Sequence, residues 1–92
     1  MTLDERVAAV AAYGFTTRQA AFLTTAMLHA GVCVQRQYAQ FAGLANGHAT
    51  REFFDRLSGQ RFATAHACWR QGGRLYHIHH KPLYHAIGEP ES

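Results

Sequence analysis

Residues 35–59, QRQYAQFAGLANGHATREFFDRLSG, decide how the rest of the chain is organised. Apolar side chains recur there at spacings of three and four in two runs, which predicts two short amphipathic helices, Gln35 to about Leu44 and about Ala49 to Ser58. Between them, Ala45-Asn46-Gly47-His48 is typical of a tight turn, because an Asn-Gly pair tolerates positive φ. Gly59 is the expected C-terminal cap of the second helix.

Each predicted helix has an apolar side and a polar side. The first is expected to bury Tyr38, Phe41, Ala42 and Leu44, and the second Ala49, Phe53, Phe54 and Leu57. Winding at about 100° per residue places the remaining polar side chains of the second helix opposite them: His48, Arg51, Glu52, Asp55 and Ser58. Two short helices joined by a turn with a glycine have the proportions of a helix-turn-helix that reads DNA. A plain helical hairpin in a small bundle is the alternative.

Length and composition limit the class of protein. Ninety-two residues, 48% of them hydrophobic, allow one domain, 1–92, with a packed core. No apolar run approaches the roughly 18 residues of a membrane span, and the N-terminal residues lack the pattern of a secretory signal. Two cysteines are too few for a disulfide framework, although a single bridge stays open. These features predict a reduced, cytoplasmic protein without a membrane partner.

The net charge of +3 is unevenly distributed along the chain. Residues 34–81 hold seven basic against two acidic side chains, whereas the rest of the chain sums to −2. Most of the bases are arginine, which suits bidentate contacts to phosphate or guanine. The asymmetry predicts an anionic partner for this part of the chain. An ordinary solvated surface is the other interpretation.

Two helices are predicted before this stretch. The pattern Thr2-x-x-Glu5 indicates a capping box, and the helix that it starts is expected to end near Gly14. The pattern Thr16-x-x-Gln19 indicates a second capping box and a longer helix to about Ala30. Residues 32–34 read as a short extended link into the helix-turn-helix.

After Gly59 the periodicity changes to two, which predicts a β-hairpin over about residues 61–80. If Gly72 and Gly73 form a two-residue loop, Trp69 pairs with Tyr76, and the alanines share their buried face. A short helix, about residues 82–87, follows at Pro82 and ends at Gly88.

The same register brings four metal-ligand side chains to the other face of the hairpin: His66 opposite His79 and Cys68 opposite His77. Four parallel vectors on a flat patch make a tetrahedral site difficult, and recognised zinc spacings are absent. We therefore predict no metal and no cofactor, with a zinc-dependent switch as an open alternative. Signatures of nucleophile elbows and phosphate loops are absent as well, so an enzyme is not expected.

A helix-turn-helix followed by a basic two-stranded hairpin resembles the winged-helix DNA-binding domain, over about residues 16–80. The resemblance implies an α+β, mainly α fold in which His48 to Ser58 is the recognition helix and 61–80 is the wing. The stretches YGFTTRQAAFLTTAMLHAGVCVQRQYAQFAG and RLYHIHHKPLYHAIGEP are also similar to the N-terminal region of uncharacterised bacterial proteins of mobile elements. Such proteins are longer, so further domains are an expectation.

The resemblance implies sequence-specific binding of double-stranded DNA, in transcriptional or replication control of a mobile element. Base contacts are expected from His48, Thr50, Arg51 and Asp55. Backbone contacts are expected from Gln35, Arg36, Gln37, Arg61, Arg70, Arg74 and Lys81. Homodimerisation through the N-terminal helix, with Val7 and Val10, or through residues 83–87 is a further expectation. The alternative is a protein-interaction or dimerisation module that does not bind DNA.

Overall fold

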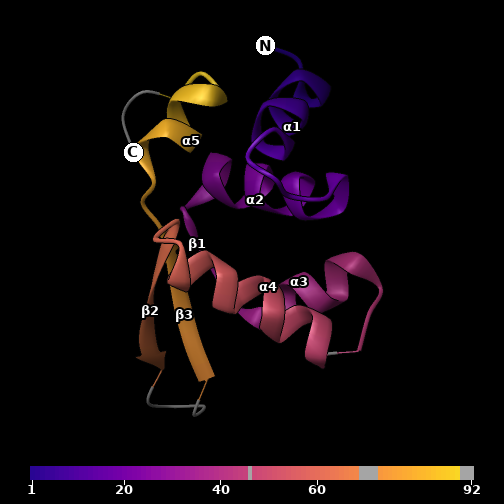
Figure 1. Ribbon diagram of the computed structural model, residues 1–92, viewed down its shortest axis with the longest axis vertical. Helices are drawn as coiled ribbons and strands as arrows, with labels where there is room; N and C mark the ends of the chain where they lie inside the picture. Colours follow the sequence, from indigo (N-terminus) through magenta and orange to yellow (C-terminus); the bar gives the residue numbers. More distant parts are fainter. Residues whose placement is uncertain (46, 69–72, 90–92) are drawn as a thin grey trace. The chain divides into compact units, whose positions relative to one another are not determined.

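The computed structural model describes residues 1–45, 47–68 and 73–89. The fold is α+β and mainly helical, with a small antiparallel sheet of three strands, as Figure 1 shows. The chain forms two compact units. We call them the helical unit, which consists of Met1–Gly31 and the chain from His80 onward, and the sheet unit, Val32–His79.

The helical unit contains α1 (Leu3–Ala11), α2 (Thr17–His29) and α5 (Lys81–Ala86). Both predicted capping boxes are confirmed. The backbone N–H of Glu5 donates to Thr2 Oγ1 at 3.1 Å, and that of Gln19 donates to Thr16 Oγ1, also at 3.1 Å. These bonds satisfy backbone donors that the first turn of a helix leaves without partners.

The apolar side chains expected to support dimerisation lie mostly inside the protein. Val10, Leu83 and Ile87 are fully buried, and Val7 is half-buried. α1 packs on α2 and on α5, so these side chains fill the core of the helical unit. The prediction of a dimer surface there is therefore wrong for Val10, Leu83 and Ile87, because a short chain needs its few large aliphatic residues for its own core.

The sheet unit contains β1 (Val32–Cys33), α3 (Gln35–Ala42), α4 (His48–Gly59), β2 (Ala63–Cys68) and β3 (Gly73–Ile78). The strand order is β1-β3-β2, and both pairings are antiparallel. The link expected at residues 32–34 contains the third strand, in which Val32 pairs with His77 and Cys33 with Tyr76. Figure 1 shows the hairpin β2–β3 to one side of the two helices of this unit.

The two helices of the expected helix-turn-helix are present with changed ends. Gly43 has a φ of +69°, and this left-handed residue ends α3 before Leu44. Phe41 and Leu44 were expected inside, but they are 49% and 42% exposed. Ala49 is exposed as well. Of the turn between the helices, Asn46 lies outside the described residues.

The predicted register of the hairpin is wrong by four residues. Ala65, not Trp69, pairs with Tyr76, and Ala63 pairs with Ile78. Cys68 is paired with Gly73, so four residues separate the paired strands where a two-residue loop was predicted. Because four is an even number, the described side chains of β2 and β3 keep their predicted faces. Tyr76 and Ile78 are buried as expected, whereas Trp69 lies outside the described residues.

An aromatic cluster joins the two helices of the sheet unit to its sheet. Ring centroids are 4.6 Å apart for Tyr38 and Phe53, 5.2 Å for Phe53 and Phe54, and 4.6 Å for Phe54 and Tyr76. Tilted and edge-on contacts of this kind add to the free energy gained by apolar burial. The cluster holds α3 and α4 against β3, and thereby sets the orientation of α4.

No helix in the described part of the chain has the length and apolar character that crossing a membrane requires.

Candidate nucleic-acid interface

The expected recognition helix, α4, turns a polar side to solvent. His48, Arg51, Glu52 and Asp55 are all exposed. Thr50 is 0% exposed, since it lies three, four and seven residues before the buried side chains of Phe53, Phe54 and Leu57. The prediction of a base contact from Thr50 is therefore wrong.

Charges on the exposed side of α4 are partly paired. His48 Nε2 lies 2.7 Å from Glu52 Oε2, and both side chains are largely exposed. No ion pair joins the described side chains of Arg51 and Asp55, although four residues separate them as they separate His48 and Glu52. The exposed guanidinium of Arg51 is therefore the cation on α4 best placed to reach an external partner.

Two predicted backbone contacts have a role inside the protein. The side-chain amide of Gln35 donates to the hydroxyl of Tyr76 at 3.1 Å, and Gln35 is half-buried. The side-chain oxygen of Gln37 accepts from the backbone N–H of Val34 at 2.9 Å, at the start of α3. Arg36 lies between the two glutamines and is exposed. Of these three residues, Arg36 is the one that offers a positive charge to solvent.

Arg61 occupies a backbone conformation that favours glycine. Its φ is +63°, and it is the only non-glycine residue with positive φ in the described ranges. The N–H of Phe62 donates to the carbonyl of Leu57 at 2.8 Å, which closes the end of α4 in the manner of a Schellman motif. Gly59 is still helical, so the prediction that it caps the helix is wrong. Arg61 is exposed and lies at the bend between α4 and β2.

The histidines of the hairpin do not pair as predicted. His66 is opposite Leu75, and Thr64 is opposite His77, so the expected pairs of His66 with His79 and of Cys68 with His77 are wrong. Thr64 Oγ1 and His79 Nε2 lie 2.7 Å apart and share a hydrogen bond. Within residues 1–45, 47–68 and 73–89, no three His, Cys, Asp or Glu side chains are grouped so that they could hold a metal ion.

Thr64 was missed as a candidate in the sequence. The sequence does contain a signal for it. Thr64 lies two residues before His66 in an alternating strand, so both side chains are expected on the same face of the hairpin. Ser58 was assigned to the polar side of α4 but to no site. Both line a hollow of about 350 Å³ together with Arg61, Ala63, Ala65 and His79.

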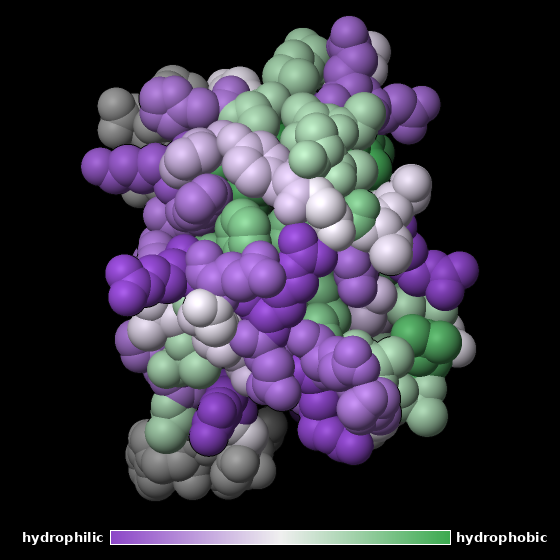
Figure 2. Space-filling model, viewed as in Figure 1, coloured by the Kyte–Doolittle hydropathy of each residue, from purple (hydrophilic) through white to green (hydrophobic). Residues whose placement is uncertain are grey.

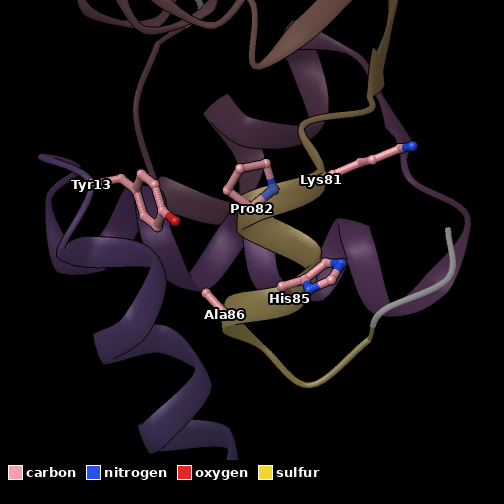
Figure 3. Close-up of a pocket in the computed structure, with 5 residues that line it drawn as sticks. All are labelled: Tyr13, Lys81, Pro82, His85 and Ala86. Atoms are coloured by element: carbon pink, nitrogen blue, oxygen red, sulfur yellow. The ribbon is translucent and has the colours of Figure 1, made fainter.

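The other predicted contacts are dispersed. Arg74 is exposed on β3 opposite Ala67, and Arg70 lies outside the described residues. Lys81 is exposed at the start of α5 and belongs to the helical unit. There it lines a hollow of about 540 Å³ with Tyr13, Pro82, His85 and Ala86. In Figure 3 the ring of Tyr13 faces Pro82, whereas the side chains of Lys81 and His85 extend away from it.

Hydropathy separates two kinds of surface on the sheet unit. Figure 2 shows hydrophilic side chains over α4 and a hydrophobic patch where α3 turns toward α4. The large hydrophobic side chains exposed at this turn are Phe41 and Leu44. The polar side of α4 and the apolar turn therefore offer different chemistry to a partner.

Cys33 in β1 is a free, buried cysteine. Burial raises the pKa of its thiol from 9.0 to about 12. A thiol with this pKa is neutral near pH 7 and a poor nucleophile. The residue therefore contributes to the core and offers no reactive thiolate to a substrate.

Comparisons with protein-family models, with curated proteins and with solved structures found no match.

Proposed function

We propose that this chain is a winged-helix domain that binds double-stranded DNA through α4 and the hairpin β2–β3. The order of its elements supports the proposal. Two short helices, α3 and α4, come first, the hairpin follows directly, and β1 adds a third strand beside β3. This is the order of elements that the resemblance to a winged helix implies. In helix-turn-helix proteins the second helix of the pair enters the major groove. In this chain the second helix is α4.

The observation that carries the proposal is the charge of the sheet unit. It holds six arginines against two carboxylates, a formal charge of +4, and one of the two carboxylates, Glu52, already faces His48. Arg36, Arg51, Arg61 and Arg74 are exposed on it. Arginines neutralise phosphates and release counterions from DNA, which supplies most of the affinity for any duplex sequence.

Each exposed group has a proposed role. Arg51 reads a guanine edge from α4, and Asp55 accepts a hydrogen bond from a cytosine amino group. Arg36, Arg61 and Arg74 contact the DNA backbone, with Arg70 and Lys81 as further backbone contacts. The proposed setting is the cytoplasm, in transcriptional or replication control of a bacterial mobile element.

Salt dependence tests the proposal directly. Four to six phosphate contacts correspond to a slope of log K against log salt of roughly −4 to −5. Fluorescence anisotropy with labelled duplexes at several salt concentrations measures this slope. Arg6→Ala, on α1 in the helical unit, is the matched control and should leave the slope unchanged, whereas Arg36→Ala should reduce it by about one. Absence of binding at low salt would contradict DNA binding.

The second candidate is a protein-interaction module. It is favoured by the exposed apolar side chains of Phe41 and Leu44, because exposed apolar patches often mark protein contacts. This alternative predicts no duplex binding at low salt, together with a partner whose affinity falls on Phe41→Ser. The two candidates therefore give opposite results in the anisotropy titration.

A further inference from the structure

A hollow lined by both polar and apolar side chains lies where α4 ends and β2 begins. Its walls are formed by Ser58 from the last turn of α4, by Arg61, by Ala63, Thr64 and Ala65 of β2, and by His79 after β3. We call it the Arg61 pocket. Its volume is about 350 Å³, which accommodates a group the size of a phosphate. Among the described residues that line it, none carries a carboxylate.

The backbone of Arg61 has an unusual conformation. A non-glycine residue with a φ of +63° is unusual, because the left-handed region is disfavoured for residues with a Cβ. Three backbone hydrogen bonds hold the chain here: from Arg61 N–H to Ser58 O at 3.2 Å, from Phe62 N–H to Leu57 O at 2.8 Å, and from His79 N–H to Phe62 O at 3.1 Å. Strained backbone of this kind is a reason to look for a function of the side chain.

Thr64 and His79 form a donor pair at the same hollow. Their Oγ1 and Nε2 atoms are 2.7 Å apart. When Nε2 of His79 carries its proton, it donates to Thr64 Oγ1, and the hydroxyl hydrogen of Thr64 is then available to a ligand oxygen. The Ser58 hydroxyl donates within α4 instead, to the carbonyl oxygens of Phe54 and Asp55, each 3.3 Å away.

We propose that the Arg61 pocket binds a phosphate group, with the Arg61 guanidinium as the cation and the Thr64 hydroxyl as a second donor. Arginine presents a planar fork of donors that matches phosphate oxygens, and such charge-assisted bonds are stronger than neutral ones. His79 is a positioning residue that orients the Thr64 hydroxyl. Where the phosphate belongs to duplex DNA, the inference rests on the proposed function and places one backbone contact beside α4.

The C-terminus of α4 repels an anion in the Arg61 pocket only weakly. A helix C-terminus carries a partial negative charge on its free carbonyls. Here three of the last carbonyls already accept hydrogen bonds: that of Arg56 from Gln60 N–H, that of Leu57 from Phe62 N–H, and that of Ser58 from Arg61 N–H. The full positive charge of Arg61 exceeds the partial charge that remains.

Titration of the full chain with inorganic phosphate tests the pocket without DNA. Amide and side-chain NMR signals of Arg61, Thr64, Ala65 and His79 should shift and saturate, whereas sodium chloride at equal ionic strength should not reproduce the shifts. Shifts that never saturate, or that are the same with chloride, would overturn the proposal. Because no DNA is present, this titration gives its answer even if the proposed function fails.

Two variants identify the donors. Arg61→Gly suits the left-handed backbone and removes the cation, and Thr64→Val keeps the branched shape in β2 and removes the hydroxyl. Each should weaken phosphate binding about tenfold, as the loss of one charge-assisted hydrogen bond does. Arg18→Ala, which removes an exposed cation of α2 that has no proposed part in binding, is the control and should bind phosphate as the unaltered chain does. Unchanged binding by both pocket variants would overturn the assignment.

A duplex arm separates the two sources of phosphate. If the ligand is the DNA backbone, Arg61→Gly lowers duplex affinity and reduces the salt slope by about one. Thr64→Val then lowers affinity with the slope unchanged, because it removes no charge. If both variants bind duplex normally but lose inorganic phosphate, the pocket serves a free phosphorylated ligand, and its phosphate chemistry still holds.

Discussion

The side-chain amide of Gln35 donates a hydrogen bond of 3.1 Å to the hydroxyl of Tyr76, forty-one residues later in the chain. Gln35 begins α3, and Tyr76 is buried in β3, the central strand of the sheet. The bond therefore ties the start of α3 to the sheet. It also means that a residue predicted to contact DNA has a partner within the protein.

Tyr76→Phe removes this bond while keeping the buried ring. We expect the free energy of unfolding to fall by about 0.5–1.5 kcal/mol, the usual net contribution of one hydrogen bond. Urea denaturation followed by circular dichroism measures it. In the double variant with Gln35→Ala the two losses should not add, since both remove the same bond. Additive losses would show that the two side chains act independently.

Arg61→Gly should make the chain more stable, although it removes a proposed phosphate contact. Glycine adopts a φ of +63° without the steric cost borne by arginine, so we expect a gain of about 0.5–1 kcal/mol. Arg61→Ala is the control, because alanine keeps the Cβ and should bring no gain. Thermal denaturation of both variants gives the answer. Equal stability of the two would contradict a cost from the left-handed backbone.

Thr50→Val should also stabilise the chain. The Thr50 hydroxyl is buried and has no hydrogen-bond partner among the described residues, and the same is true of Thr24 in α2. Replacing an unpaired buried hydroxyl with a methyl group should raise the free energy of unfolding by about 1 kcal/mol. Thr24→Val makes the same change in the helical unit, so it is the control for any effect of Thr50→Val on DNA binding. Duplex affinity and base preference should stay unchanged in both, and a changed preference in Thr50→Val would restore it as a base contact.

Cys33 should resist thiol reagents in the folded chain. Because burial raises its pKa to about 12, the thiolate is scarce at neutral pH. In a Cys68→Ser variant, labelling by Ellman's reagent should be slow natively and fast in denaturant. The raised pKa also makes stability depend on pH. The protonated Cys33 thiol contributes fully to the free energy of unfolding below pH 9.0, the ordinary pKa of the group, and this contribution is lost as the pH rises toward about 12. Equal labelling rates in both states would contradict a buried thiol.

Arg51→Ala distinguishes base reading from backbone contact. On the preferred duplex it should cost about 1–3 kcal/mol of binding free energy, and much less on random DNA. Arg74→Ala should weaken both duplexes alike and reduce the salt slope by about one. A library selection supplies the preferred site, and anisotropy measures the affinities. An unchanged sequence preference in Arg51→Ala would move base reading to another surface, most directly to Arg36 on α3.

The sequence by itself determined the order of the five helices and the hairpin, and the starts of the first two helices. Thr2 and Thr16 act on the backbone within a few residues, so their effects can be read locally. The alternation likewise determined which face of the hairpin the side chains of residues 63–67 and 74–78 occupy. These features need no knowledge of what packs against them.

Tertiary structure decided the features that join distant residues. The hairpin register depends on how many residues lie in the connection, and a Gly-Gly pair does not reveal that number. The two-residue strand β1 gives too short a pattern to be recognised and exists because β3 offers it backbone partners. The positive φ of Arg61 and the burial of Thr50 follow from how α4 meets the sheet. The residues that line the proposed phosphate pocket come from the end of α4, from β2 and from the chain after β3, and only the folded chain brings them together.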